Sequence, residues 1–482
     1  MPTRPAPRLG DVATRSGVVA ALAAASLLAA AHPAPARAAA RQPTFFQAPR
    51  DLIGVSAAHR ARAFAELRSL GVDALRVVVY WERVAPGPRS PRAPRFDATD
   101  PRSYDWSAYD PAIAEAHALG WRILLTVSGP VPRWTTAAHR DNVTRPDPLL
   151  FQRFMTAVAR HYGAEVSLFS IWNEPNHPAF LRPQYTARHR PASPGLYRSL
   201  WEAGYRGLVL GGIARPRVLF GETAPTGSPH DVAPITFLKD ALCLDDDYRM
   251  ASTCRRLPAF GYAHHAYTTP AGPFWRPPSP DDVTIGALSR LARALDRAAR
   301  AGAVRRDLPI YLTEFGVQSR PNRWLGVSPQ RQAEFDAISE MIAWENPRVA
   351  AFSQYLLRDD VTVDRPGASL HGLGTGFQTG LEYANGRRKP LFDGFRLPLA
   401  VIRRGRHVTL WGLVRPAHGA TTVTVLVKRS RRSRFTTLAR RRTGPRGCWT
   451  MRSPVVGVAW RVQWRSPHGT RYEGPAIPSF PA

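Results

Sequence analysis

The sequence predicts a (β/α)8 TIM barrel followed by a C-terminal antiparallel β-sandwich. From about residue 50 to residue 396, short apolar runs alternate with helical stretches, which is typical of a parallel sheet. Eight such repeats favour a closed barrel over an open sheet. After residue 398, apolar and polar residues alternate between turn signals, which indicates antiparallel strands. We therefore expect a barrel domain over 41–397 and a β-sandwich domain over 398–482.

The barrel elements follow from short apolar runs and from apolar residues at helical spacing. The expected strands are 52–56, 74–80, 122–127, 167–172, 218–221, 260–266, 309–314 and 350–356. The expected helices are 57–70, 111–119, 149–162, 195–209, 235–242, 283–301, 329–344 and a short one at 390–395. Three long connections follow strands, at 81–110, 129–148 and 173–194. In such a barrel the loops after the strands carry the site.

The C-terminal region combines a β pattern with a large excess of positive charge. Its expected strands are 407–414, 421–428, 435–440, 448–452 and 457–464. The region holds seventeen Lys and Arg residues and one acid, Glu473. If any part of the chain binds an anionic polymer or the cell wall, we expect this domain to do so. A packing module that shields the barrel is the alternative.

The N-terminal segment predicts export. Arg4, Arg8 and Arg15 precede the apolar stretch 18–31. Ala-Arg-Ala at 36–38 then offers a cleavage site of the small-x-small type. We expect a signal peptide over 1–40 and a secreted, extracellular mature protein, with an uncleaved anchor as the alternative. No later segment is apolar enough to predict a transmembrane helix.

The whole chain has a net charge of +30, from 66 Lys and Arg against 36 Asp and Glu. This balance suits anionic partners, or it reflects an arginine-rich composition. No specific nucleic-acid module is recognisable, although the Arg-rich tail keeps nucleic-acid binding as an alternative. Cys243 and Cys254 bracket a short polar loop and are a disulfide candidate in an exported protein, which leaves Cys448 unpaired. Their spacing does not resemble a zinc site, so no metal is expected.

Two glutamates stand where strands are expected to end. Glu174 follows the fourth expected strand, and Glu314 ends the seventh. Both would lie at the same rim of an eight-stranded barrel, so the two carboxylates can flank one bond. Glycoside hydrolysis needs such a pair, whereas a surface salt bridge is the alternative for either residue alone. Glu222, at the end of the fifth strand, suits substrate binding or no role at all.

Four short motifs resemble those of the clan A glycoside hydrolases. Trp-Asn-Glu-Pro-Asn at 172–176 and Leu-Thr-Glu-Phe-Gly at 312–316 look like the acid/base and nucleophile motifs of that clan. The run 75–83 resembles the second strand of the cellulase-like glycoside hydrolase family 5, and 172–176 is equally similar to family 39. His-Ala-Tyr at 265–267 resembles the clan's His-x-Tyr motif.

The resemblance implies a role for each matched residue. Glu174 would be the general acid and then the base, and Glu314 the nucleophile. Arg76 and Tyr267 would keep the nucleophile ionised, because a fixed cation and a hydrogen-bond donor favour the anion. Asn173 would bind the sugar 2-hydroxyl. Carboxyls at these positions in this clan imply a separation of about 5 Å and retention of a β configuration.

Further substrate contacts are expected at the barrel rim. His265 would contact the same sugar or orient the acid, with a structural histidine as the alternative. Trp134 is a candidate for stacking on a sugar face, with plain packing as the alternative. The family's eighth strand usually ends in Trp, whereas here Tyr355 and Gln354 take that place, which leaves the sugar open.

The combined prediction is a secreted retaining β-glycosidase that acts on a β-linked oligo- or polysaccharide. No organic cofactor is expected, because two carboxylates suffice for the reaction. A non-catalytic glycan- or wall-binding protein on a relic barrel is the alternative.

Overall fold

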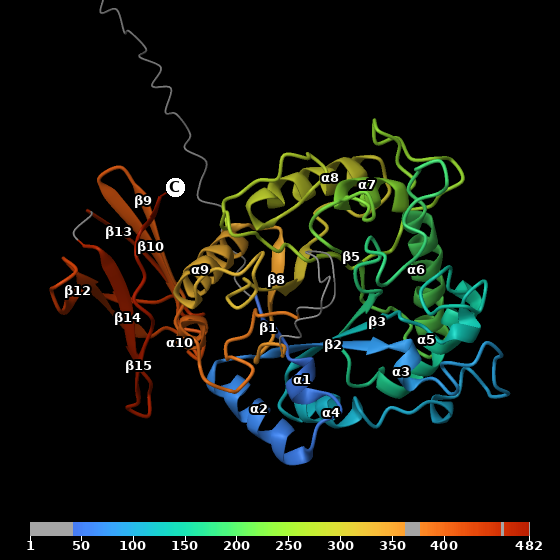
Figure 1. Cartoon of the computed structure of the whole chain (residues 1–482), viewed down its shortest axis with the longest axis horizontal. Coiled ribbons are helices and arrows are strands. Elements are labelled where there is room, and N and C mark those ends of the chain that lie inside the picture. The colour runs from blue at the N-terminus through green and yellow to red at the C-terminus, as the bar shows by residue number, and fades with distance from the viewer. Residues whose placement is uncertain (1–41, 362–375, 455–456, 482) are drawn as a thin grey trace, which may run out of the picture. The chain divides into compact units, whose positions relative to one another are not determined.

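A closed barrel of eight parallel strands forms the larger part of the molecule (Figure 1). The computed structural model describes residues 42–361, 376–454 and 457–481, so the expected signal peptide lies outside the described residues. Strands pair in chain order, and β8 closes the barrel by pairing with β1. The strands are β1 (Thr44–Gln47), β2 (Ala74–Tyr80), β3 (Arg122–Ser128), β4 (Leu168–Ile171), β5 (Val218–Thr223), β6 (Gly261–His264), β7 (Ile310–Phe315) and β8 (Val349–Tyr355).

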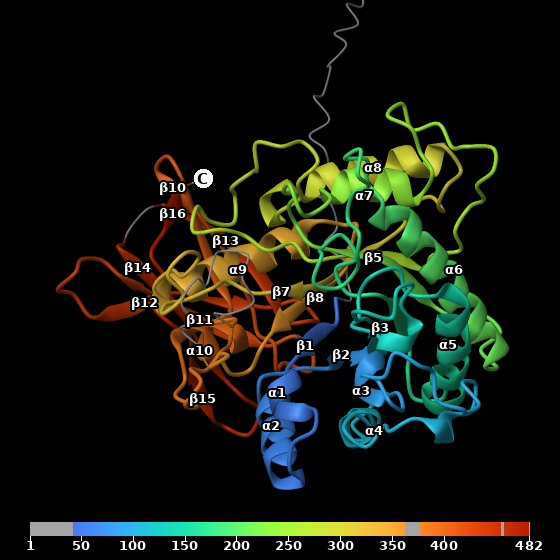
Figure 2. The ribbon, with the colours of Figure 1, turned by 45° about the vertical axis from the view of Figure 1, so that its right-hand side comes forward.

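Helices follow the strands and surround the barrel (Figures 1 and 2). They are α1 (Pro49–Leu52), α2 (Ala57–Ser69), α3 (Trp81–Val84), α4 (Asp110–Ala118), α5 (Pro148–Tyr162), α6 (Ser193–Leu210), α7 (Pro234–Ala241), α8 (Leu288–Arg300), α9 (Pro329–Glu345) and α10 (Pro390–Arg396). Three of them begin at a residue whose side chain caps the helix, namely Ser56 before α2, Asp147 before α5 and Ser328 before α9. None of the helices in the described part of the chain is both long and apolar enough to cross a membrane.

The first strand lies earlier than the sequence predicts. The expected strand 52–56 is wrong, because β1 spans Thr44–Gln47 and Leu52 ends the short helix α1. The reason is local: Pro49 starts a helical turn, and Gly54 adopts a positive φ of 66° that interrupts an extended chain. This shift places Gln47, rather than a later residue, at the barrel mouth.

The C-terminal region is a sandwich of two four-stranded sheets, with strand orders β13-β10-β9-β16 and β12-β11-β14-β15. Its strands are β9 (Leu399–Arg404), β10 (His407–Leu413), β11 (Thr422–Lys428), β12 (Phe435–Arg442), β13 (Cys448–Pro454), β14 (Ala459–Arg465), β15 (Arg471–Glu473) and β16 (Phe480–Pro481). The sequence predicted five of them and missed β9, β15 and β16. The last two are too short to show an alternating pattern.

The sandwich packs on α9 of the barrel. The rings of Trp344 in α9 and Trp411 in β10 lie 6.3 Å apart, within a shared apolar cluster. Beside them, the Arg415 guanidinium donates to both carboxylate oxygens of Glu340, at 2.6 and 2.7 Å. This buried two-point ion pair fixes the sandwich to α9.

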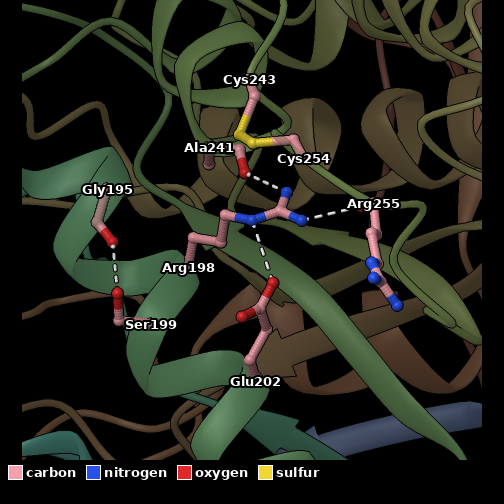
Figure 3. The surroundings of a disulfide bond; sticks show 8 residues. All are labelled: Gly195, Arg198, Ser199, Glu202, Ala241, Cys243, Cys254 and Arg255. Carbon is pink, nitrogen blue, oxygen red and sulfur yellow. Dashed lines mark hydrogen bonds and ion pairs between the residues drawn. A yellow bond between two sulfur atoms is a disulfide. The ribbon is translucent and has the colours of Figure 1, made fainter. Parts of the chain in front are cut away.

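A disulfide joins Cys243 and Cys254, as the sequence suggested, and Cys448 is free. Figure 3 shows how the bridged loop meets α6: Arg198 donates to the carbonyl oxygens of Ala241 and Arg255 at 3.0 and 2.7 Å. The same guanidinium pairs with Glu202 of α6. The loop before β6 is thereby held on the outside of the barrel, away from the strand ends that carry the acids.

Candidate active site

Two carboxylates from distant parts of the sequence meet at the carboxyl ends of the barrel strands. Glu174 lies three residues past the end of β4, and Glu314 is the penultimate residue of β7. One oxygen of each carboxylate and one ring nitrogen of His265 lie within 4.8 Å of one another. The expected pair therefore shares one site, with His265 beside it.

The backbone after β4 is strained in a way that packing maintains. Trp172 and Glu174 have positive φ angles of 72° and 42°, which cost side-chain-bearing residues on the order of 1 kcal/mol or more each. The fully buried Trp172 indole donates to the Phe180 carbonyl, and the Glu174 amide donates to the Glu222 carbonyl, at 3.0 and 2.9 Å. These contacts hold the Asn-Glu pair turned into the barrel mouth.

Glu314 accepts a hydrogen bond at each carboxylate oxygen. The Arg76 guanidinium donates to Oε2 at 2.7 Å, and the Tyr267 hydroxyl donates to Oε1 at 2.7 Å. Its side chain is 10% exposed. The Glu314 side chain is therefore held in place by a fixed cation and a hydroxyl donor.

Arg76 is a buried cation that organises the mouth of the barrel. Besides Glu314, its guanidinium donates to Glu222 at 2.5 Å, to the Asn173 side-chain oxygen at 2.7 Å and to the Gln47 side chain. Burial opposes its charge, but the carboxylates of Glu222 and Glu314 outweigh burial and raise the pKa of Arg76 above its ordinary value. Arg76 therefore remains charged whatever the state of the substrate.

Glu174 has a different environment. Its side chain is 17% exposed, and its Oε1 lies 2.9 Å from Nδ1 of His265. Burial raises the pKa of Glu174 to about 7, against the opposing charges of His177 and Arg76 and with Glu222 adding to the rise. Burial also lowers the pKa of His265 to about 4, so this histidine is neutral at neutral pH. A neutral imidazole can accept the proton of Glu174 or donate to its anion.

Glu222 belongs to the site, although the sequence left its role open. It lies in β5 with a φ of 50° and is completely buried. Thr126 donates to its Oε1 at 2.9 Å, and Arg76 to its Oε2. Oε2 also lies 3.9 Å from Nε2 of His265, a nitrogen for which the described part of the chain supplies no hydrogen-bond partner. The signal in the sequence was an acid, Glu222, at the end of a third expected strand. The sequence did not show that Glu222 pairs with Arg76.

Asn173 is positioned with one side-chain group left for a ligand. Its side-chain oxygen accepts from Arg76, and its backbone amide donates to Ser128 Oγ at 2.9 Å. Among the residues that the structure describes, none accepts a hydrogen bond from its side-chain nitrogen. This nitrogen can therefore donate to a hydroxyl placed between the two glutamates.

Two tryptophans near the rim pack instead of facing a ligand. The expectation that Trp134 stacks on a sugar is corrected: its side chain is 3% exposed and meets the edges of Trp81 and Phe96. Its indole donates to the Pro86 carbonyl at 3.3 Å. Trp172 is fully buried as well. A tryptophan after a strand has the same sequence signal in either role, which is why the pattern could not separate them.

The end of β8 supplies Tyr355 to a cavity of about 390 Å³ that also reaches Arg76. Gln354 is not available to a ligand, because its amide donates to the carbonyl of Thr379 inside the protein. The acids that follow are paired: Asp359 with the buried Lys389, and Asp360 with Arg50. These acids therefore form ion pairs at the rim.

The group Glu174, His265 and Glu314 could in principle hold a metal ion, since its ligand atoms lie within 4.8 Å of one another. Both oxygens of Glu314 already accept hydrogen bonds, one of them from the Arg76 cation. A metal ion there would face the repulsion of that guanidinium. The arrangement fits two carboxylates acting on an organic substrate better than a metal centre.

No protein-family model and no curated protein sequence matches the chain. Solved structures with a similar chain path include a glucosidase from Croceicoccus marinus, with 13% identity, a TM-score of 0.49 and coverage of 88% of this chain and 94% of that one. A family 39 glycoside hydrolase from Bacteroides cellulosilyticus has 15% identity, a TM-score of 0.49 and coverage of 84% and 80%. A Bacteroides uniformis β-glucuronidase has 12% identity and a TM-score of 0.48, and the match spans 92% of this chain but 46% of that chain. At such low identity, function has to be inferred from the geometry of the site itself.

Proposed function

We propose that this protein is a retaining β-glycosidase of the clan A type, in which Glu314 is the nucleophile and Glu174 the general acid and base. The observation that carries the proposal is the close approach of the two carboxylates, whose nearest oxygens lie within 4.8 Å. Retaining enzymes separate these groups by about 5 Å, whereas inverting enzymes need roughly 6.5 Å or more to admit a water molecule. Oxygens within 4.8 Å of each other are compatible with the shorter separation, and on this basis we favour direct attack by one carboxylate.

The first half of the reaction uses both glutamates at once. The Glu314 carboxylate attacks the anomeric carbon while Glu174 gives its proton to the glycosidic oxygen, which leaves as an alcohol. The bond from the anomeric carbon to the leaving oxygen breaks as the ester bond to Glu314 forms. Arg76 and Tyr267 hold Glu314 in place, and the free nitrogen of Asn173 donates to the sugar 2-hydroxyl.

The second half reverses the roles. Glu174, now a carboxylate, takes a proton from water, and the water oxygen attacks the anomeric carbon and releases Glu314. Two inversions leave the configuration unchanged. The pKa of Glu174, raised to about 7 by burial, suits a group that must carry a proton in one half and accept one in the other.

The test is a screen of purified protein against aryl and natural β-glycosides of the gluco, galacto, manno, xylo and uronic acid series. We expect at least one substrate to be cleaved, and Glu174→Ala and Glu314→Ala to lower its turnover by orders of magnitude. Unchanged rates in both variants would contradict the proposal. Glycan binding without cleavage of any substrate would favour the non-catalytic alternative. The hydrogen-bond donor on each carboxylate oxygen of Glu314 argues against that alternative.

We further propose that the protein is exported, with residues 1–40 as the signal peptide. The support is the order of a basic start, an apolar stretch and a small-x-small triplet. N-terminal sequencing of protein from the producing cells and their medium tests this. We expect mature protein in the medium that starts near residue 40; full-length protein retained in the cytoplasm would contradict it.

We propose that the outer face of the β12-β11-β14-β15 sheet binds an acidic glycan or wall polymer. Val423, Val425 and Val427 of β11 fill the sandwich core, so alternate positions face outward. The basic residues at such outward positions are Lys428, Arg440, Arg442, Arg461, Arg465 and Arg471. Glu473 is the acid among them, and it pairs with Arg461.

Binding to this sheet should respond to salt and to charge. We expect retention on an acidic polysaccharide that falls as salt rises and is lost in the triple variant Arg442→Gln, Arg465→Gln, Arg471→Gln. The triple variant Arg403→Gln, Arg404→Gln, Arg406→Gln, at the β9–β10 hairpin of the other sheet, is the control. Equal retention of the two triple variants would contradict the proposal that this sheet face binds the polymer.

A further inference from the structure

A cavity of about 390 Å³ opens beside the candidate active site, at the carboxyl ends of β1, β2 and β8. Gln47 and Arg76, which bond to each other, form part of its wall, so the cavity meets the same guanidinium that holds Glu314. A sugar placed on Glu314 therefore has this cavity next to it. The remaining side chains of the cavity wall determine which chemical group of the substrate can enter it.

The wall is cationic. Three arginines line the cavity, namely Arg50, Arg76 and Arg83, and among the described residues no aspartate or glutamate does. Arg76 is neutralised by Glu222 and Glu314, and Arg50 is paired with Asp360.

Arg83, in α3 directly after β2, differs from the other two arginines. Within 42–361, 376–454 and 457–481, no carboxylate pairs with it. Its guanidinium lies 5.5 Å from the centre of the Tyr80 ring. Arg83 therefore supplies the cavity with a positive charge that no described carboxylate neutralises.

Two phenols add neutral donors to the same wall. Tyr80 and Tyr355 both line the cavity, and no described residue accepts a hydrogen bond from either hydroxyl. Burial raises the pKa of Tyr80 to about 12 and raises the pKa of Tyr355 as well, so both keep their protons. An anion that enters the cavity would meet a guanidinium and two hydroxyl donors.

We propose that the cavity receives an anionic substituent of the substrate, a sugar carboxylate or sulfate ester, and that Arg83 is the residue that selects it. The proposal rests on the glycosidase function above and narrows its substrate class to acidic sugars. Arg83 is exposed, so water can solvate its charge in the free protein. A neutral sugar that covered it would remove this hydration without supplying a partner, so the cavity also disfavours neutral substrates.

Binding of free sugars tests the inference without turnover. Calorimetric titrations of the full protein would compare glucuronate, galacturonate and mannuronate, and the glucose, galactose and mannose 6-sulfates, with the three neutral parent sugars. We expect one acid or sulfate to bind at least about 10-fold more tightly than its parent, and Arg83→Gln to remove that preference. Arg89→Gln changes an exposed arginine of the same connection outside the cavity and should keep the preference.

The preferred member of the panel identifies the anion as carboxylate or sulfate. Equal affinity for acidic and neutral sugars, a preference that survives Arg83→Gln, or no detectable binding of any acid or sulfate would overturn the inference.

Turnover separates this inference from the proposed function. With the aryl β-glycosides of the same sugars, Arg83→Gln should lower kcat/KM for the preferred acidic substrate by roughly 10- to 100-fold, mainly through KM. Efficient cleavage of a neutral glycoside that is unaffected by Arg83→Gln would overturn the anionic cavity and leave the glycosidase proposal standing. Cleavage that is lost in Glu174→Ala and Glu314→Ala but unchanged in Arg83→Gln would likewise overturn the anionic cavity and leave the glycosidase proposal standing.

Discussion

The surroundings of Glu314 and Glu174 differ, although both side chains lie in one barrel mouth. Glu314 has a donor on each oxygen, the Arg76 guanidinium and the Tyr267 hydroxyl. Glu174 has one neutral partner, His265, and burial raises its pKa to about 7. The two side chains thus have different surroundings, and this difference supports the proposed roles of Glu314 as nucleophile and Glu174 as acid.

The largest effect is expected when Glu314 is neutralised. Glu314→Gln keeps the shape of the side chain but removes the attacking anion, so kcat should fall on the order of 10⁵-fold. Steady-state kinetics on the substrate found in the screen measures this. In Glu314→Ala, which leaves room for a small anion, azide should restore part of the activity and give a product of inverted configuration, because it attacks from the face that Glu314 occupied. A loss below about 100-fold would contradict the nucleophile assignment.

The next effect is expected at Glu174, and it should depend on the leaving group. Glu174→Gln cannot give up a proton, so cleavage of glycosides with poor leaving groups should fall by about 10²- to 10⁴-fold. Activated aryl glycosides need less protonation and should lose less in the first step. Kinetics over a series of leaving groups measures the dependence, and an equal loss across the series would remove the distinction between the two glutamates.

The raised pKa of Glu174 also predicts how stability changes with pH. Its folded-state pKa, about 7, lies above the ordinary glutamate value, so folding favours the protonated form and this contribution is lost as pH rises from about 4.5 through 7. Glu174→Gln should therefore gain stability relative to the wild type between pH 5 and pH 8, by roughly 2 to 3 kcal/mol. Urea denaturation at several pH values measures the difference. A constant difference would mean that Glu174 is ionised over the whole range.

Glu222 is expected to act through its neighbours. Glu222→Gln keeps the hydrogen bond to Arg76 but removes a negative charge that raises the pKa of Glu174. The alkaline limb of the kcat profile should shift to lower pH, with kcat reduced by about 10-fold. A rate loss without a shift in the pH profile would indicate a purely structural role. Thr126→Val is the matched control, because it removes the hydrogen bond of Thr126 to Glu222, together with the one that Thr126 accepts from Arg76, and changes no charge.

The smallest effect is expected at Trp134. Since its indole is buried among Trp81 and Phe96, Trp134→Phe should lower stability by about 1 to 2 kcal/mol and leave KM unchanged. Thermal unfolding and steady-state kinetics measure both quantities. A large increase in KM with unchanged stability would restore Trp134 as a substrate contact.

Much of the fold was visible in the sequence because barrel strands are continuous apolar runs and their order fixes the topology. Seven of the eight barrel strands were predicted near their observed positions, and the first was misplaced because Pro49 and Gly54 override the apolar residues between them. The candidate pair followed from strand ends alone. The pairing of Glu222 with Arg76 could not be predicted, and the choice between stacking and packing for Trp134 could not be made, because both depend on side-chain packing across the barrel.

Covalent trapping tests the asymmetry of the two glutamates most directly. The protein would be treated with the 2-deoxy-2-fluoro analogue of its preferred β-glycoside, which slows release of the sugar from the nucleophile, and the labelled peptide would be sequenced by mass spectrometry. The account predicts one sugar per protein, attached to Glu314, and none in Glu314→Gln. A sugar attached to Glu174, or cleavage of the parent glycoside with inversion and no adduct, would contradict it.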